Sequence, residues 1–443
     1  MIINDIVEVL YGPVKAFKRI IEKPQYLGAI IIILLFVVAM VGYESAEFSK
    51  VYAENTSPQI GVLSSFTNAT FWNSAPGVNV SNNYADYFNY SVYVVGLSYP
   101  PNDSRGYYNL FANYTKDIGP SSLEINASNT NTATEALNIA SALNSVNSSV
   151  PYVNCGASSG FENLSITMKQ VSPAVAPLSA TLTLYSINDT SFFKYDLTSS
   201  ISNESINAWN NLTIPVGPNA NGWSSSGTPA WGNITSLKLD FSYPTSSNIS
   251  VRIGALFFRG QYVNALQSGG TDILIRFVEA FPLQFLFTWL FLTGAIYLFF
   301  KGLKAGIVWK PVFVAVSFAL FVMVIRGVVN LLAVVAMPNV YFPFDVSLGG
   351  ATNILGAISY PTDAIGHLTV MSQTAATTIN SSTALLGNIT FGMFAISYIW
   401  LGALCTIIVG TLKPEFTLTK RILISAVSVG VTLLLLLLLV NII

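Results

Sequence analysis

The sequence is poor in charged residues and contains one histidine and two cysteines. Only 9% of its 443 residues are charged, against about 25% in a typical soluble domain. The formal net charge is −1, so the chain lacks the basic excess that is typical of nucleic-acid-binding proteins. With His367 as the single histidine and Cys155 and Cys405 as the cysteines, Cys/His metal centres and most histidine-based catalysis are excluded.

Catalytic motifs are equally sparse. The chain has no H-E-x-x-H and no phosphate-binding loop, and a glycosidase would need two carboxylates held at a defined separation, which no spacing here indicates. We therefore expect no enzymatic activity, no catalytic residue and no cofactor.

The hydrophobic residues, 52% of the chain, are concentrated in five stretches. A transmembrane helix needs roughly 20 apolar residues. The stretches that qualify are residues 27–43, 281–300, 311–337, 389–410 and 422–443. Since Glu44 and no small-residue cleavage site follows the first stretch, we predict an uncleaved anchor in place of a signal peptide. The sequence thus predicts a membrane α-helical bundle of five transmembrane helices.

Lysine and arginine near the ends of these stretches predict the orientation. They precede the first stretch and lie in every second loop: Lys15, Lys18, Arg19 and Lys23; Lys301, Lys304 and Lys310; Lys413, Lys420 and Arg421. Residues 338–388 contain neither. We therefore predict a plasma-membrane protein with a cytoplasmic segment 1–26, a first span 27–43, an extracellular region 44–272, and a four-helix membrane region 273–443 with an external loop 338–388 and an extracellular C-terminus.

Glycosylation sequons, N-x-S/T, agree with this topology because all sixteen fall in the two segments predicted to be outside. The candidate acceptors are Asn55, Asn68, Asn79, Asn89, Asn102, Asn113, Asn126, Asn147, Asn163, Asn188, Asn203, Asn211, Asn233, Asn248, Asn380 and Asn388. Chance occurrence in a segment rich in Asn, Ser and Thr is the alternative reading of the pattern.

The first 25 residues are predicted to be helical, because apolar residues recur at helical spacing from Ile6 to Ile21. Pro13 is expected to break this helix in two. The helix either lies in the cytoplasmic interface of the bilayer or packs beneath the bundle.

The membrane part resembles a known family. It combines the lead with Gly12-Pro13 and Phe17, a turn at Pro24, Pro338 after the third span, and the tail SYIWLGALCTIIVGTLKPEFTLTKRILISAVSVGV. Over residues 1–43 and 275–443 this is similar to the five-span Yip family, named for interaction with Rab-type GTPases, and its prokaryotic or archaeal relatives are the better comparison. The family's first external loop is short, whereas here it exceeds 220 residues.

Arg326 is the one formal charge deep in a predicted span, and Asn330 lies four residues on, on the same helix face. Such residues face the bundle interior or a wet cavity and mark transport or relay sites, or else form structural pairs. We identify no acidic partner in the other spans, which weakens the transport reading.

Between residues 44 and 272 the pattern changes to period two. SATLTLYS, SLKLDFSYP and ISVRIGALFFRG alternate apolar and polar residues between turn residues, which predicts an antiparallel β-sandwich inserted between the first and second spans. NYSVYVVGL and SSLEINAS are earlier strand candidates, and residues 132–146 are predicted to be a helix or loop on the surface.

One passage is more specific. Trp209 opens a strand, Gly222-Trp223 closes a loop, and Trp231-Gly-Asn-Ile-Thr leads into the next strand, with Phe71-Trp72 supplying an early one. Over residues 60–260 this resembles the galactose-binding-like jelly rolls of carbohydrate-binding modules and lectin-like domains. The resemblance makes Trp223, Trp72 and Trp231 candidates for glycan contact, with packing in the framework as the alternative. It also allows a structural calcium, for which Asp86, Asp103, Asp117 and Glu162 are available without a diagnostic spacing; a metal site stays unknown.

The resulting hypothesis is a non-enzymatic cell-surface membrane protein that presents a glycosylated jelly-roll domain to surface glycans or envelope proteins on a Yip-like anchor in the lipid bilayer. One alternative is a membrane-organising or trafficking protein that acts through its cytoplasmic faces, with a small GTPase as partner. A third hypothesis is a transporter centred on Arg326.

Overall fold

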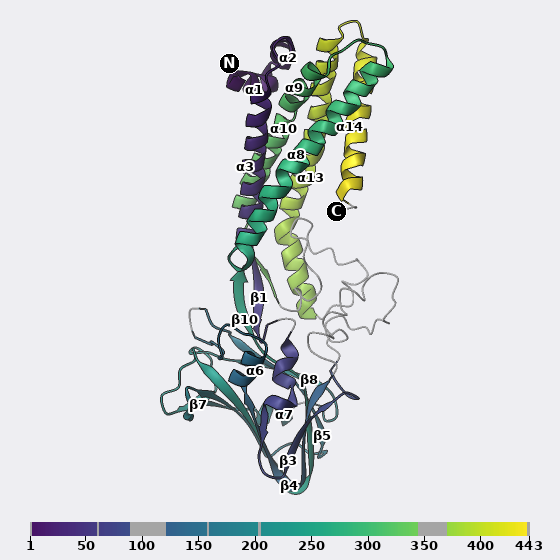
Figure 1. Cartoon of the computed structure of the whole chain (residues 1–443). Coiled ribbons are helices and arrows are strands. Elements are labelled where there is room, and N and C mark those ends of the chain that lie inside the picture. Colours follow the sequence, from purple (N-terminus) through teal and green to yellow (C-terminus); the bar gives the residue numbers. More distant parts are fainter. Residues whose placement is uncertain are drawn as a thin grey trace.

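The structure, a computed structural model, describes residues 2–59, 62–88, 121–156, 159–202, 205–343 and 370–440. These residues form a helical bundle and a β-sheet region, joined by a narrow stalk (Figure 1). The two classes of element predicted from the sequence, five long apolar helices and a large antiparallel β region, are both present.

The bundle contains five apolar segments long enough to cross a membrane. They are α3 (Tyr26–Lys50), Leu274–Gly302 of α8 (Ala265–Gly302), Trp309–Ala336, which comprises α9 (Trp309–Ala319) and α10 (Phe321–Ala336), Thr377–Leu412 of α13 (Val370–Leu412), and Leu418–Leu439 of α14 (Leu418–Val440). Phe36, Trp289 and Ile408 belong to the cluster at their centre. Leucines such as Leu34 and Leu298 remain exposed on the outside, as expected for faces that meet lipid.

The first of these helices is longer than predicted. The prediction ended it at Tyr43 because Glu44 and Glu47 interrupt the apolar run, but α3 continues to Lys50. Glu44 and Glu47 are nevertheless buried, with 8% and 0% of their surface exposed. Packing of this last part of α3 against neighbouring helices extends it, which the apolar run could not indicate.

Two short helices precede α3. Pro13 separates α1 (Ile2–Tyr11) from α2 (Pro13–Glu22), because a proline is accepted in the first turn of a helix but not in its interior. Arg19 of α2 donates to Asp5 and Glu8 of α1, and Phe17 is fully buried in the cluster of the bundle. The two helices therefore pack against the bundle, whereas their position in the interface of the bilayer stays a prediction.

The stalk comprises β1 (Val51–Ser57), the end of β10 (Ile234–Asn264) and β11 (Val340–Phe342). β1 continues α3 without a loop, and β10 leads directly into α8. β1 pairs antiparallel with β10, Tyr52 opposite Asn264, and parallel with β11, Tyr52 opposite Tyr341. The two crossings between bundle and sheet therefore run side by side through one three-stranded ribbon.

The β region is organised by two long antiparallel strands, β4 (Ser122–Asn138) and β10, which pair along most of their length. The first half of β10 continues outward through β6 (Ser179–Ser186), β7 (Asn188–Asp196) and β9 (Trp223–Ser226), and β2 (Trp72–Ser74) flanks β4 there. The second half of β10 pairs with β5 (Asn163–Ser172), which pairs with β8 (Asn210–Pro215), and β3 (Val78–Asn83) flanks β4.

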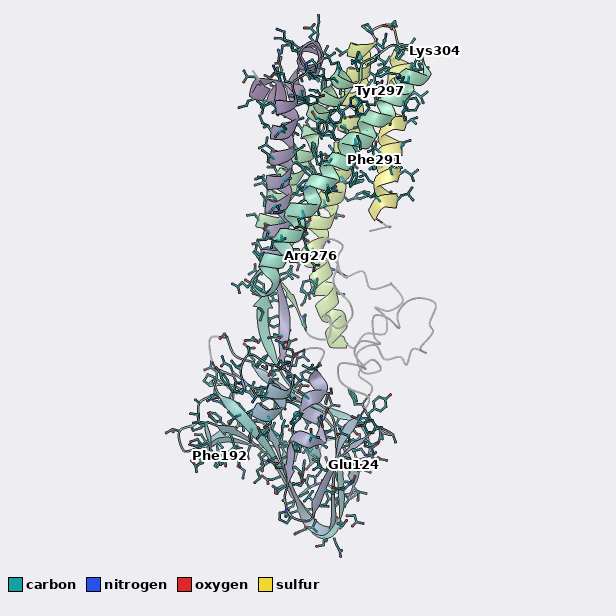
Figure 2. All side chains as sticks on the ribbon, viewed as in Figure 1. Glu124, Phe192, Arg276, Phe291, Tyr297 and Lys304 are labelled. Atoms are coloured by element: carbon teal, nitrogen blue, oxygen red, sulfur yellow. The ribbon has the colours of Figure 1, made fainter. Side chains whose placement is uncertain are left out.

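These two halves enclose a common core, so the continuous sheet folds into a sandwich. Leu182 and Leu239 from one half and Ile166 and Ile253 from the other belong to a single buried cluster. The strand alternation read from the sequence places these apolar residues inward, as period two requires. In Figure 2, Glu124 and Phe192 lie in this sandwich, whereas Phe291 and Tyr297 lie on α8 of the bundle.

The prediction of a helix or loop over residues 132–146 is wrong for its first half. β4 runs to Asn138, and Ala133, Glu135 and Leu137 point inward with at most 1% exposed. Ala, Glu and Leu are strong helix formers, but pairing with β2 and β10 on both edges overrides that preference. The helix is confined to α6 (Ile139–Ser145), whose Ile139 and Leu143 belong to the core.

Candidate functional site

The three tryptophans proposed from the sequence lie in different surroundings. Trp72 is 6% exposed, and its Nε1 donates to the carbonyl of Phe66 at 2.9 Å. This ring therefore has no free face for a sugar. Trp231 stacks on Phe193, with 3.8 Å between the ring centroids and 12° between the planes. It is half-buried and packs on the core of the sandwich.

Trp223 forms an aromatic cluster with Trp231, Phe193 and Tyr195. Its ring meets Trp231 edge to face at 5.2 Å and lies 5.0 Å from Tyr195. The Nε1 of Trp223 donates to the carbonyl of Pro215 at 2.7 Å. Gly222 precedes it with a φ of +88°, and a Cβ there would lie 2.8 Å from the Tyr195 ring, so glycine is required at this turn. The faces of the cluster are occupied mainly by one another.

A groove of about 500 Å³ lies directly beyond this cluster, where the sandwich meets the stalk. Residues of three distant segments form its walls: Cys155, Gly156 and Ser159–Asn163; Pro215–Ala220, at and after the end of β8; and Gly260–Tyr262 of β10. The Pro215 carbonyl that receives the Trp223 bond belongs to one wall, and the amide of Cys155 donates to the carbonyl of Trp231 at 2.7 Å. The aromatic cluster therefore supports the groove from behind.

Amide residues and Tyr262 belong to the lining of the groove. Gln261 accepts a 3.1 Å hydrogen bond from Nδ2 of Asn55 and donates to the carbonyl of Ser159, which fixes its orientation across the groove. Tyr262 is 38% exposed and meets Tyr341 edge to face at 5.3 Å. Of the described lining residues, Glu162 alone carries a charge. Such a lining suits a neutral ligand with both hydroxyls and apolar faces.

Gly160 allows the tight backbone loop in this wall of the groove. A Cβ on Gly160 would lie 2.4 Å from backbone atoms of Cys155 and Gly156, closer than any real contact.

The thiol of Cys155 is buried, which raises its pKa and keeps it protonated, so it is a poor nucleophile.

The sequence reading passed over one pattern in this wall. Gly156-Ala157-Ser158-Ser159-Gly160 matches the G-x-S-x-G of serine hydrolases. That motif works at a turn from a strand into a helix, whereas here it precedes strand β5, and Ala157 and Ser158 lie outside the described residues. The local context therefore does not favour a nucleophile elbow.

Among the calcium candidates, Asp86 is engaged by cations of the protein itself. Lys169 lies 2.9 Å from its carboxylate, and Arg252 pairs with both Asp86 and Glu124. Burial alone would raise the pKa of Asp86, but hydrogen bonds from Lys169 and Arg252 outweigh it and hold the pKa below its usual value. Asp103 and Asp117 lie outside the described residues, and within the described part no group of three His, Cys, Asp or Glu side chains could hold a metal ion.

In the bundle, Arg326 lines a small cavity of about 40 Å³ between α3, α8, α10 and α13. Its guanidinium lies 5.0 Å from the centre of the Phe394 ring. Asn330, one turn further along α10, is 1% exposed. A cavity of this size holds no more than a few water molecules, so the described residues form no substrate-sized chamber at Arg326.

The sequons lie on several surfaces of the described chain. Asn79, Asn147, Asn188, Asn248 and Asn388 are exposed; Asn55, Asn68, Asn126, Asn163, Asn211, Asn233 and Asn380 are half-buried. Asn380 and Asn388 were predicted to lie in a loop, but both lie in α13. That helix begins earlier than the apolar run. Asn89, Asn102, Asn113, Asn203 and His367, the strand predicted near Val92 and most of the loop 338–388 fall outside the described residues.

No protein-family model and no curated protein matches the chain, so the resemblance to the Yip family stays a prediction. Among solved structures, the chain is similar to a family 11 carbohydrate-binding module from Clostridium thermocellum in complex with a β-1,3-1,4-mixed-linked tetrasaccharide. The identity is 15%, and the match covers 48% of this chain and 97% of the module with a TM-score of 0.26. The solution structure of CtCBM11 matches at 15% identity over 43% and 88% of the two chains, with a TM-score of 0.24. The similarity is weak, and these scores support no inference about the ligand.

Proposed function

We propose that this chain is a membrane-anchored carbohydrate-binding protein whose ligand, a neutral oligosaccharide, lies in the groove between the sandwich and the stalk. The observation that carries this proposal is a groove of about 500 Å³ whose lining includes the amide residues Gln261, Asn163 and Asn219 and, among the described lining residues, a single charged one, Glu162. A sugar has an apolar face that stacks on an aromatic ring, and hydroxyls that pair with amide donors and acceptors.

The tryptophans have a supporting role in this proposal. Trp223 holds the Pro215 wall through its Nε1, and Trp231 is fixed by stacking on Phe193. Tyr262, Gln261 and Asn163 line the groove and are the proposed contacts. The chain acts as a binding protein and not as an enzyme.

The proposed setting is the outer face of a plasma membrane. The basic residues at one end of the bundle support a cytoplasmic N-terminus, with the sandwich and the C-terminus outside. Exposed sequons such as Asn188 and Asn248 would then carry glycan and keep a charge-poor domain soluble.

The test uses the full-length protein in lipid nanodiscs and a panel of neutral oligosaccharides that includes a mixed-linked β-glucan tetrasaccharide. We expect saturable binding by calorimetry, and a loss of affinity of about tenfold or more in Tyr262→Ala, equivalent to about 1.4 kcal/mol. Tyr84→Ala is the matched control, because Tyr84 is 69% exposed but does not line the groove. Absence of saturable binding at millimolar sugar, or equal losses in both variants, would overturn the proposal.

A further inference from the structure

A group of buried polar side chains occupies the end of the bundle that adjoins the stalk. It comprises Tyr43, Glu44 and Glu47 of α3, Asn330 of α10 and Thr390 of α13, which we call the junction cluster. Tyr43, Glu47 and Asn330 have at most 2% of their surface exposed. Polar groups buried this deeply normally have partners, because their desolvation is otherwise uncompensated.

These side chains lack such partners among the described residues. Both carboxylate oxygens of Glu47, the hydroxyls of Tyr43 and Thr390, and Oδ1 of Asn330 are buried without a hydrogen bond. All five atoms are oxygens that can act as acceptors, and the hydroxyls of Tyr43 and Thr390 can also donate. A buried group of oxygen atoms without hydrogen-bond partners favours a positively charged ligand.

Contacts between helices bring these residues to one level. Tyr43 lies within interaction range of Glu47, Glu44 and Thr390, so α3 and α13 meet at its hydroxyl. On the other side of α3, Gly42 faces α10. A Cβ placed on Gly42 would lie 3.5 Å from the side chain of Leu331. Asn330, adjacent to Leu331, is therefore at the height of Tyr43.

Arg326 contributes one positive charge to this region, but it forms no ion pair with either acid among the described residues. Arg326 interacts electrostatically with Tyr398 and Tyr43. Its guanidinium lies over the Phe394 ring, and its Nε has no hydrogen-bond partner in the described part of the chain. Two carboxylates and one guanidinium leave a formal charge of −1 in this region. A single positive charge would balance it, whereas a divalent ion would exceed it.

We propose that the junction cluster binds one monovalent hard cation, of the Na⁺ type, between α3, α10 and α13. Carboxylate, hydroxyl and amide oxygens are the ligands that hard cations prefer. The ion would tie three helices together at the point where α3 becomes β1, and so hold the stalk in place. This site is separate from the sugar groove and does not depend on it.

The test measures cation binding by the full-length protein in nanodiscs. We expect saturable equilibrium binding of ²²Na⁺ at one ion per chain. We also expect a thermal unfolding midpoint that rises with NaCl when N-methyl-D-glucamine chloride keeps the ionic strength constant. Glu47→Gln should remove both effects. Glu279→Gln should retain both, because Glu279 is exposed on α8.

Two further variants keep the test decisive if Glu47→Gln fails to fold. Thr390→Val and Asn330→Leu should each weaken ²²Na⁺ binding by about tenfold. The proposal is overturned if the wild-type protein binds no ²²Na⁺ saturably, if Ca²⁺ binds in its place, or if unfolding responds to pH but not to Na⁺.

Discussion

The side-chain amide of Asn264 donates a 2.8 Å hydrogen bond to the carbonyl of Ser49, and so joins the two crossings between the sandwich and the bundle. Ser49 lies in the last turn of α3, and Asn264 is the residue before α8. Oδ1 of the same side chain accepts from the amides of Leu266 and Gln267 at 3.0 and 3.3 Å, which caps α8. One side chain thus fixes both the start of a helix and its position beside a neighbouring one.

Replacement of Asn264 by Ala should therefore destabilise the junction by about 1–2 kcal/mol, the usual loss for a helix cap together with a buried hydrogen bond. The measurement is chemical unfolding of the purified protein in detergent. Asn264→Asp is the matched control: it keeps the acceptor that caps α8 but loses the donor to Ser49. A result in which both variants equal the wild type would contradict this assignment.

Glu135 should make the sandwich less stable above neutral pH. It is fully buried in β4, and burial raises the pKa of its carboxyl from 4.5 to about 7. An acid whose folded pKa lies above its unfolded pKa contributes stability that is complete below the unfolded value and is lost as the pH rises through the folded value. The free energy of unfolding should thus fall between pH 4.5 and 7.

Glu135→Gln should remove that dependence and raise the unfolding free energy above pH 7 by on the order of 3 kcal/mol. Unfolding curves at pH 5 and pH 8 measure this difference. Asp189→Asn, a change at an exposed acid of β7, should leave the pH profile unaltered. A parallel pH profile for wild type and Glu135→Gln would refute the argument.

Gly160→Ala should distort the wall of the groove, because the added Cβ would meet the backbone of Cys155 and Gly156 at 2.4 Å. We expect a loss of about 1–3 kcal/mol in stability and weaker binding of any oligosaccharide ligand. In the control Gly232→Ala, the nearest atom to the new Cβ is Oδ1 of Asn154 at 3.7 Å, so both properties should be retained. Full stability and binding in Gly160→Ala would show that the loop relaxes freely.

Long apolar runs and period-two strands could be predicted from residue order. The break at Pro13 and strands such as SATLTLYS were recognisable because proline sterics and side-chain alternation act over a few residues. The second half of β4 could not be recognised from the sequence. Ala, Glu and Leu there favour a helix, and they form a strand only because both edges are paired. The end of α3 was missed for a similar reason: Glu47 is buried by other helices, not by its own neighbours in sequence.

For the candidate sites, too, residue order predicted some features, and others depended on packing between distant residues. The sequence by itself determined that the chain has five membrane-length apolar helices and a charge-poor β region, because length and composition suffice for both. Only the tertiary structure decided that Trp72 and Trp231 pack inward, that the loop before β5, the segment after β8 and Tyr262 share one groove, and that Tyr43 lies beside Glu47 and Thr390. These relationships join residues that are far apart in the chain, and packing against partners on other elements brings them together.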